Sequence, residues 1–185
     1  ADIVKRLQRY RNDSLEDVLV HLRTWDLDND VNAVAPTILY LFRMQKYDIE
    51  MDEEEMAMSL QFAKDHLLKH FGTVDVPWGT FSRIRRGDIH LPVYGYDDLL
   101  GNRWSRIDPD DGRAYTTGGD TFMMFAQYDD DGLAVLETIA PFGNSDRPES
   151  PHYTDQMKRY SQKGTKRIPV DRETIFSEAA RIYHP

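Results

Sequence analysis

The sequence predicts an α+β protein in which N-terminal helices are followed by antiparallel strands. Up to Gly72 the apolar residues recur at spacings of three and four, which is typical of amphipathic helices. From Thr73 onward glycine and proline are frequent, and the apolar runs shorten to strand length. With 185 residues and a hydrophobic fraction of 40%, residues 1–185 are expected to form one segment, helical over 1–72 and strand-rich over 73–185.

The first predicted helix begins near Ser14 and ends near Trp25. Ser14 and Asp17 together resemble a capping box, in which two side chains satisfy the free backbone N–H groups of the first turn. The apolar residues of this segment share one helical face: Leu15, Val18, Leu19 and Leu22. We expect that face to pack on the core.

Two further helices are predicted before Gly72. The second is expected to be capped by Asp30 or Asn32 and to hold Pro36 in its first turn, where proline is tolerated. Its apolar residues are Val34, Ala35, Ile38, Leu39 and Phe42. The third begins at Asp52 with three glutamates, which the helix dipole favours there, and stops at Gly72. Its expected core face is Met56, Leu60, Ala63, Leu67 and Phe71.

The strand-rich part contains one clear hairpin, over residues 121–139, with a turn at 129–132. Both arms are largely apolar, so we expect interior strands covered on both faces. Extended segments pinned by proline are predicted at 76–79 and 91–95. The polar stretch 97–119 is predicted to be a loop.

Composition excludes several classes of partner and site. A formal net charge of -9 argues against binding to nucleic acid and to anionic membrane surfaces, because both are recognised mainly by Lys and Arg. The chain has no cysteine, so disulfides, thiol nucleophiles and thiolate metal sites are ruled out. No apolar run is long enough to span a bilayer. We therefore expect neither a nucleic-acid nor a membrane partner.

A dense polar motif follows the hairpin, over residues 143–156. Its sequence is Gly-Asn-Ser-Asp-Arg-Pro-Glu-Ser-Pro-His-Tyr-Thr-Asp-Gln. This motif resembles the C-terminal part of penicillin-acylase-type N-terminal-nucleophile hydrolases, which include acyl-homoserine lactone acylases and aculeacin-type acylases. The matching residues are Asn144, Ser145, Pro148, Ser150, Pro151, His152, Asp155 and Gln156. The one visible departure is Asn144, where the family often has glutamine.

Weaker matches extend the resemblance over most of the chain. Pro-Trp-Gly at 77–79, Leu-Pro-Val at 91–93 and Gly-Gly-Asp-Thr-Phe at 118–122 follow in the order expected of the family. The resemblance implies that the chain forms a C-terminal portion of the four-layer αββα Ntn-hydrolase fold. It also implies a parent enzyme that hydrolyses a linear amide, in an acyl-homoserine lactone, a lipopeptide or a β-lactam side chain. The motif and the 163–169 tail look more like the first two branches than like penicillin acylases.

The catalytic groups of such an enzyme are not predicted in this chain. The family's nucleophile is a serine, exposed by self-cleavage of a precursor, whose own α-amino group acts as base. Ala1 cannot take this role. The family's oxyanion-stabilising Asn and its associated Arg precede the segment that this chain matches. We therefore predict no catalytic residue here and no turnover by the isolated chain.

The resemblance also implies partners and a compartment. The expected partner is the remainder of the acylase, meaning the small subunit and the N-terminal part of the large subunit. Strands taken from a larger sheet leave an unpaired edge, so self-association of the isolated segment is expected. A periplasmic or secreted location is inferred from the family alone. No cofactor and no metal ligand is predicted here. The resemblance allows a calcium ion in the parent enzyme, but its ligands cannot be assigned to this segment.

Ser150, His152 and Asp155 have the residue types of a catalytic triad, but a structural role is favoured. Triad members normally converge from distant segments, and residues two and three positions apart do not readily adopt that geometry. Short polar side chains commonly satisfy nearby backbone groups instead. We therefore interpret the motif as one that fastens the last strands in place, with a chemical role as the alternative.

Other candidate sites are weaker. His66 and His70 lie four apart on a predicted helix, but the glutamate that a zinc-protease motif requires is absent, so a helix-end surface pair is favoured over a metal site. The Asp-x-Asp-x-Asp run at 26–30 lacks the glycine and glutamate of a calcium loop. The acidic runs 108–112 and 129–132 are interpreted as turns, with a weak cation site as the alternative. The three tryptophans are assigned to packing rather than to a carbohydrate surface: Trp25, Trp78 and Trp104.

A second hypothesis of a different class stays open. The chain could be a free-standing, non-catalytic α+β binding module that retains an acylase-like hairpin, since its helices carry their own caps and its composition is polar. The two hypotheses differ in the gene upstream of Ala1, where the acylase requires an open frame with an internal processing junction and the module requires a start codon.

Overall fold

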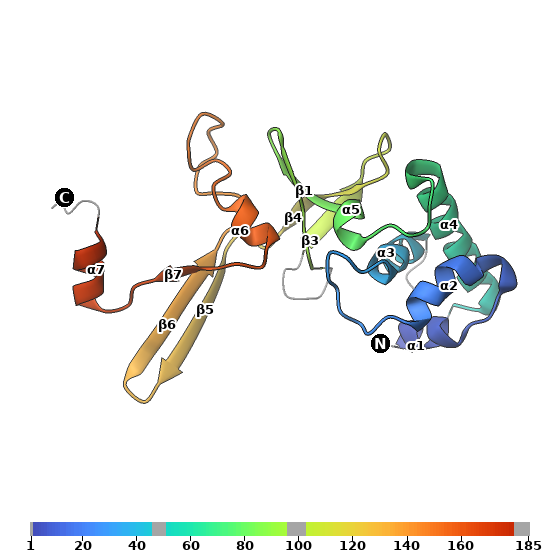
Figure 1. Ribbon diagram of the computed structural model, residues 1–185, viewed down its shortest axis with the longest axis horizontal. Coiled ribbons are helices and arrows are strands. Elements are labelled where there is room, and N and C mark those ends of the chain that lie inside the picture. The colour runs from blue at the N-terminus through green and yellow to red at the C-terminus, as the bar shows by residue number, and fades with distance from the viewer. Residues whose placement is uncertain (1, 46–50, 96–102, 180–185) are drawn as a thin grey trace. The chain divides into compact units, whose positions relative to one another are not determined.

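The computed structural model describes residues 2–45, 51–95 and 103–179, and these form two compact units, 1–119 and 120–185 (Figure 1). The first unit contains most of the helices and one sheet, and the second contains the hairpin and a smaller sheet. The predicted α+β class, with helices first and largely antiparallel strands after, is confirmed.

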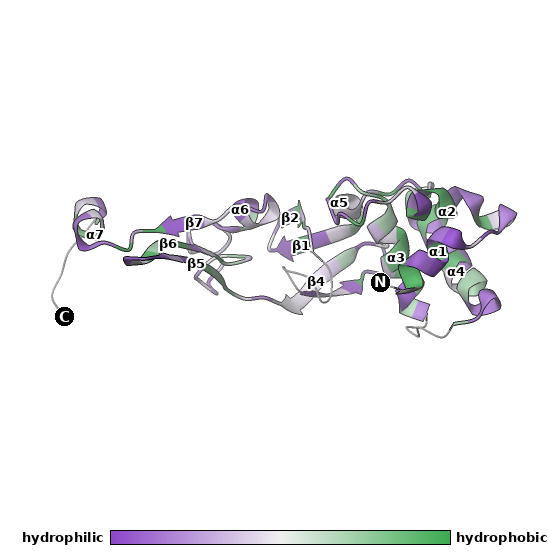
Figure 2. Ribbon diagram, turned by 90° about the horizontal axis from the view of Figure 1, so that it is seen from below, coloured by the Kyte–Doolittle hydropathy of each residue, from purple (hydrophilic) through white to green (hydrophobic). Residues whose placement is uncertain are grey.

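The first unit is built on a helical core. Its helices are α1 (Asp2–Arg9), the short 3-10 helix η1 (Asp13–Leu15), α2 (Glu16–Arg23), α3 (Ala35–Gln45), α4 (Glu53–Phe71) and α5 (Trp78–Phe81). Helix α3 is mainly apolar along its length (Figure 2) and buries seven residues, Pro36 among them. The largest fully buried side chains of the unit include Trp78, Phe42 and Phe81. Helix α1 was not predicted.

Helix α4 has the ends that its sequence predicts. Asp52 Oδ1 accepts a hydrogen bond from the backbone N–H of Glu55 (2.9 Å), and Glu55 Oε2 accepts one from the backbone N–H of Asp52 (3.0 Å). Gly72 ends the helix with φ 72°, the left-handed conformation that favours glycine. The predicted core face is buried at Met56, Leu60, Ala63 and Leu67, and Phe71 packs partly buried against the same core.

The predicted cap of the first helix is wrong. Asn12 is the cap: its Oδ1 accepts from the backbone N–H of Ser14 (3.1 Å) and begins η1, from which α2 continues. Asp17 instead forms an ion pair with Lys64 Nζ of α4 (2.8 Å). Helix α2 ends at Arg23, close to the end predicted near Trp25.

The predicted cap of α3 is also wrong. Asp30 Oδ1 accepts from the backbone N–H of Asn32 (2.9 Å), which closes a turn ahead of the helix. The helix begins later, at Ala35, where the carbonyl of Val34 accepts from the backbone N–H of Thr37 (3.0 Å). Pro36 lies in the first turn, as predicted.

The first unit also contains a four-stranded sheet of order β2-β1-β4-β3, formed by β1 (Ser82–Arg86), β2 (Ile89–Pro92), β3 (Arg103–Ile107) and β4 (Ala114–Gly119). The pairs β1–β2 and β3–β4 are antiparallel, and β1–β4 is a short parallel pair. The loop predicted over 97–119 is therefore wrong over β3 and β4, whereas residues 108–113 between them form the predicted turn. Residues 96–102 lie outside the described part.

The sequence of β3 is not typical of a strand, because its buried residue is an arginine, Arg103. Arg103 is only 4% exposed, and its guanidinium donates to the backbone carbonyls of Tyr94 (2.8 Å) and Gly95 (2.7 Å). A buried charge is tolerated when its donors are satisfied. Those acceptors come from another segment, so the local sequence gives no sign of them.

The extended segments are correct in part. Leu91 and Pro92 belong to β2, whereas Trp78 and Gly79 belong to the short helix α5. Glycine is required at 79 because a Cβ there would lie 2.9 Å from Cβ of Val31. The close approach of the 31–33 turn is fixed by hydrogen bonds from Trp78 and Gly79 to that turn.

The second unit is a three-stranded antiparallel sheet of order β5-β6-β7 with two short helices. Its elements are β5 (Met123–Asp129), β6 (Gly132–Ile139), α6 (Met157–Ser161), β7 (Lys166–Ile168) and α7 (Arg172–Glu178). The predicted hairpin is confirmed, whereas α6, β7 and α7 were not predicted. The expectation that both arms are covered on both faces is wrong for the described residues, since Met124 is 60% and Tyr128 70% exposed. Few side chains among the described residues of this unit are buried: Ile139, Ala140, Pro141, Met157 and Tyr160.

Candidate functional site

The polar motif 143–156 connects strand β6 to helix α6. Its last residue, Gln156, makes three of the hydrogen bonds that close it. The backbone N–H of Ala140 donates to Gln156 Oε1 (3.2 Å), and Gln156 Nε2 donates to Asn144 Oδ1 (3.1 Å). The backbone N–H of Gln156 donates to the carbonyl of Phe142 (2.9 Å). Gln156, at the C-terminal end of the motif, is therefore hydrogen-bonded both to Asn144 near the N-terminal end and to the backbone that follows β6.

Gly143 and His152 bring the two arms of the motif into backbone contact. The backbone N–H of Ser145 donates to the carbonyl of His152 (3.2 Å). A Cβ at position 143 would overlap that same carbonyl oxygen and lie 2.6 Å from Asp155 Oδ1. Only glycine permits the two arms to lie this close, because a side chain at 143 would clash with backbone atoms of His152, which cannot rotate away as a side chain could.

Histidine and aspartate of the motif form a pair, but the serines do not complete a triad with them. His152 Nδ1 lies 2.9 Å from Asp155 Oδ2. The Ser150 hydroxyl accepts from the backbone N–H of His152 (3.2 Å), and no described hydrogen bond joins it to the imidazole. Ser145 Oγ accepts from the backbone N–H of Arg147 (3.2 Å). These are contacts of local turns, and nucleophilic activation would need a serine hydroxyl against the ring nitrogen.

The remaining motif residues also lie in turns. Pro148 and Pro151 flank Ser150 at exposed positions. Asp155 ends the turn segment immediately before Gln156, the residue that precedes helix α6. The His152–Asp155 pair is open to solvent, with side chains 67% and 39% exposed. The arrangement orients an imidazole at the surface of the motif.

Helix α6 anchors the motif and then reverses the chain. Met157 and Tyr160 of this helix are almost completely buried. The helix ends in a Schellman motif: Lys163 N–H donates to the carbonyl of Tyr160 (3.0 Å), and Gly164 N–H to that of Arg159 (2.9 Å). Lys163 has φ 58°, so a lysine occupies the left-handed position where glycine is usual.

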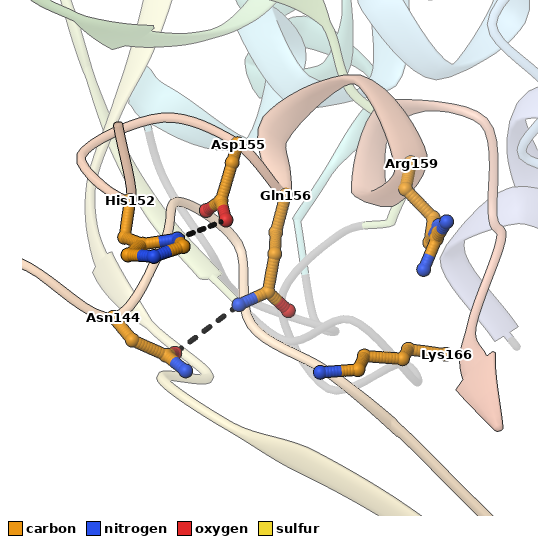
Figure 3. Close-up of a pocket in the computed structure, with 6 residues that line it drawn as sticks. All are labelled: Asn144, His152, Asp155, Gln156, Arg159 and Lys166. Carbon is orange, nitrogen blue, oxygen red and sulfur yellow. Dashed lines mark hydrogen bonds and ion pairs between the residues drawn. The ribbon is translucent and has the colours of Figure 1, made fainter. Parts of the chain in front are cut away.

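A pocket of about 360 Å³ opens beside the motif (Figure 3). It is lined by four motif residues and by two cations that follow them: Asn144, His152, Asp155, Gln156, Arg159 and Lys166. The two cations were missed by the sequence reasoning, because α6 and β7 were not predicted and no spacing rule links residues 159 and 166.

A known protein family matches nearly the whole chain, including the 143–156 motif. The family model for penicillin amidase matches residues 1–177. The chain belongs to the penicillin amidase family. The resemblance drawn from the motif is thereby confirmed, and it extends over both units.

Individual relatives are distant and much longer. The chain is 24% identical over 120 residues to the acyl-homoserine lactone acylase PvdQ of Pseudomonas savastanoi pv. phaseolicola, covering 64% of this chain and 15% of the relative. It is 23% identical over 138 residues to PvdQ of Pseudomonas syringae pv. tomato, covering 71% and 18%. The matches therefore span less than a fifth of these relatives.

One solved structure matches with low sequence identity and a low TM-score. The thermostable penicillin G acylase of Alcaligenes faecalis is 17% identical, with a TM-score of 0.35, over 97% of this chain and 36% of that chain.

The other predicted candidates do not form a site in the described residues. His66 Nε2 contacts the carbonyl oxygen of Gly112 (2.8 Å), and its ring centroid lies 4.6 Å from that of His70, with the two planes tilted by 37°. The histidines thus hold the 108–112 turn rather than forming a free surface pair. Asp26 Oδ1 accepts from the backbone N–H of Asp28 (2.9 Å), which closes a turn.

The described residues offer neither a metal-binding cluster nor a membrane-spanning helix. They contain no cluster of three His, Asp or Glu side chains arranged to hold a metal ion. None of their helices is both long and apolar enough to cross a bilayer. Of the tryptophans, Trp78 is buried in the core and Trp104 is 62% exposed.

Proposed function

We propose that the chain is the C-terminal segment of the large subunit of an amide-hydrolysing acylase, in which it serves as scaffold. The single observation that carries this proposal is the match of the penicillin amidase family over residues 1–177, including the 143–156 motif. Family membership supports amide hydrolysis by a parent enzyme. The acyl-homoserine lactone acylases among the relatives favour an acyl-homoserine lactone or lipopeptide as substrate over a β-lactam side chain.

The motif supports a scaffold role through its hydrogen bonds. Gln156 and Asn144 join the end of β6 to the start of α6, and both serine hydroxyls accept from backbone N–H groups. A buried or partly buried backbone group that loses its partner costs about 1 to 3 kcal/mol. We infer that the motif is kept for this closure, and that the nucleophile and oxyanion groups belong to other parts of the polypeptide.

The remainder of the acylase is the proposed partner. In the second unit β5 hydrogen-bonds to β6 on one side only among the described strands, and its exposed residues include Met124, Phe125 and Tyr128. An apolar edge strand of this kind favours pairing with another strand. A periplasmic or secreted location and a calcium ion elsewhere in the parent enzyme are proposed on the family alone.

The test compares two purified proteins from one gene: the full-length polypeptide and the 185-residue chain. Each is assayed with an acyl-homoserine lactone and with a chromogenic phenylacetyl amide. We expect turnover by the full-length protein and none by the chain. Turnover by the chain that survives removal of any full-length enzyme would contradict the scaffold role.

A free-standing binding module is the second candidate, favoured by the self-contained core of the first unit. The module hypothesis predicts a start codon directly upstream and a monomer that melts cooperatively. The acylase hypothesis predicts an upstream open frame with a processing junction, and self-association or binding of a hydrophobic dye by the isolated chain.

A further inference from the structure

Two cationic side chains from different elements point into the pocket beside Gln156. Arg159 comes from α6 and Lys166 from β7, and Figure 3 shows both directed into the hollow next to the Gln156 amide. Within residues 2–45, 51–95 and 103–179, neither forms an ion pair or a side-chain hydrogen bond. Cations that face a pocket without a carboxylate partner create a positive potential there.

The fold fixes the backbone of both cations. Gly164 closes against Arg159: its N–H donates to the Arg159 carbonyl, and a Cβ at 164 would lie 3.0 Å from Arg159 Cγ. The stem of Arg159 is thus held by the Schellman turn. Lys166 is the first residue of β7 and is paired with Thr138 of β6. The two side chains therefore approach the pocket from rigid elements rather than from loops.

The lining groups together leave a net positive charge, because two cations face one carboxylate. Asp155 is the one carboxylate among the six lining residues, and His152 Nδ1 already lies 2.9 Å from its Oδ2. Asn144 Oδ1 accepts from Gln156, which leaves the Asn144 Nδ2 donors available. The lining thus offers two cations and an amide donor against one paired carboxylate, in a chain whose net charge is -9.

We propose that this pocket is a binding site for a small oxyanion, a carboxylate or a phosphate group. A guanidinium presents two parallel N–H groups that match two oxygens of such a group, and an ammonium adds a point charge. The Asn144 amide can donate to a third position. This binding is independent of the proposed amide hydrolysis, because it involves no group assigned to that chemistry.

The test is a titration of the isotope-labelled 185-residue chain with sodium phosphate, and separately with acetate, followed by NMR. Ionic strength is held constant by exchanging chloride. We expect saturable shifts of the Asn144 and Gln156 side-chain amides and of Arg159 Nε. Arg159→Gln combined with Lys166→Gln should weaken the apparent affinity at least about tenfold, because both charges are removed at similar side-chain length.

Matched controls lie on the same elements. Lys158→Gln on α6 and Arg167→Gln on β7 remove neighbouring cations that do not line this pocket, and should leave the affinity unchanged. The charge-keeping pair Arg159→Lys and Lys166→Arg should retain binding, which keeps the test valid if the neutral double variant misfolds. Shifts that do not saturate, or that chloride reproduces, would overturn the proposal.

The source of the oxyanion is separated by a second arm. The same phosphate titration is repeated with the full-length polypeptide. Binding retained there supports a free small anion as the ligand. Binding lost there, but present in the isolated chain, shows that the remaining polypeptide fills or covers the pocket, as a carboxylate of that polypeptide would. Absence of saturable binding in the isolated chain overturns the site in either case.

Discussion

The side chains of Gln156 and Asn144 are hydrogen-bonded across twelve residues of the motif, with Nε2 of Gln156 donating to Oδ1 of Asn144 at 3.1 Å. The other end of the same amide accepts from the backbone N–H of Ala140. A single side chain thus uses both its donor and its acceptor to hold the end of the hairpin.

Replacing Gln156 by alanine should therefore loosen the motif. We expect the second unit to lose about 1 to 2 kcal/mol, because a backbone donor and an amide each lose a partner. Hydrogen exchange followed by mass spectrometry should show faster exchange over residues 139–157. Gln162→Ala, at the exposed end of α6, is the control and should leave that exchange unchanged.

Gly143→Ala should be more damaging than a comparable change elsewhere. The added methyl group meets the His152 carbonyl, which cannot move without breaking its bond to Ser145, so we expect a loss of about 2 to 3 kcal/mol. Gly118→Ala is the control. Its Cβ would lie 2.8 Å from Trp104, but that side chain is 62% exposed and can move. Equal losses for the two variants, measured by hydrogen exchange around each site, would contradict the assigned contact.

Lys163→Gly should stabilise the second unit. Lys163 adopts φ 58° at the end of α6, and a side chain in this conformation costs about 1 kcal/mol relative to glycine. Lys158→Gly places the same substitution inside the helix, where it should destabilise by about 1 kcal/mol. The prediction is thus a difference in sign between two Lys→Gly changes five residues apart, read from exchange protection of Tyr160 and Gly164.

The first unit should lose stability in mild acid. Burial lowers the pKa of His66 below its ordinary value of 6.5, and the neighbouring His70 and Lys69 act in the same direction, although the hydrogen bond to the Gly112 carbonyl opposes them. Between the lowered pKa and 6.5 the folded chain binds fewer protons than the unfolded chain. The free energy of unfolding therefore falls as pH falls through this window.

Urea unfolding followed by tryptophan fluorescence at about pH 7.5 and 5.5 measures this effect. All three tryptophans lie within residues 1–119, so the signal reports the first unit alone. His66→Gln should flatten the dependence, and His90→Gln, at an exposed position, should not. A slope unchanged by His66→Gln would remove His66 as its cause.

Elements with local end signals could be predicted from the sequence. Helix α4 carries its capping box at Asp52 and its stop at Gly72, and the hairpin carries an Asp-rich turn ending in Gly132. Both signals act within a few residues, so tertiary contacts are not needed to predict them. The motif residues could likewise be found, because they follow one another in the same order as in the family that the chain resembles. The family match over residues 1–177 confirmed that resemblance.

Elements that depend on distant partners could not be predicted. Strand β3 is polar, and its Arg103 can be buried because the carbonyls of residues 93–95 accept hydrogen bonds from its guanidinium. The pocket is a similar case. Arg159 and Lys166 face the same hollow because the turn at Lys163 reverses the chain, and a lysine in the left-handed conformation is not suggested by its residue type.

Position 112 is subject to two separate restrictions, and they differ in what would relieve them. Its φ of 72° disfavours any side chain, and a Cβ there would also overlap the ring of His70. Shortening His70 to alanine would leave both restrictions in place, because the Cβ of residue 70 itself lies 2.5 Å from where a Cβ at 112 would be. Substitution at 70 should therefore still require glycine at 112, and a side chain at 112 would require both a different turn and a wider separation from helix α4.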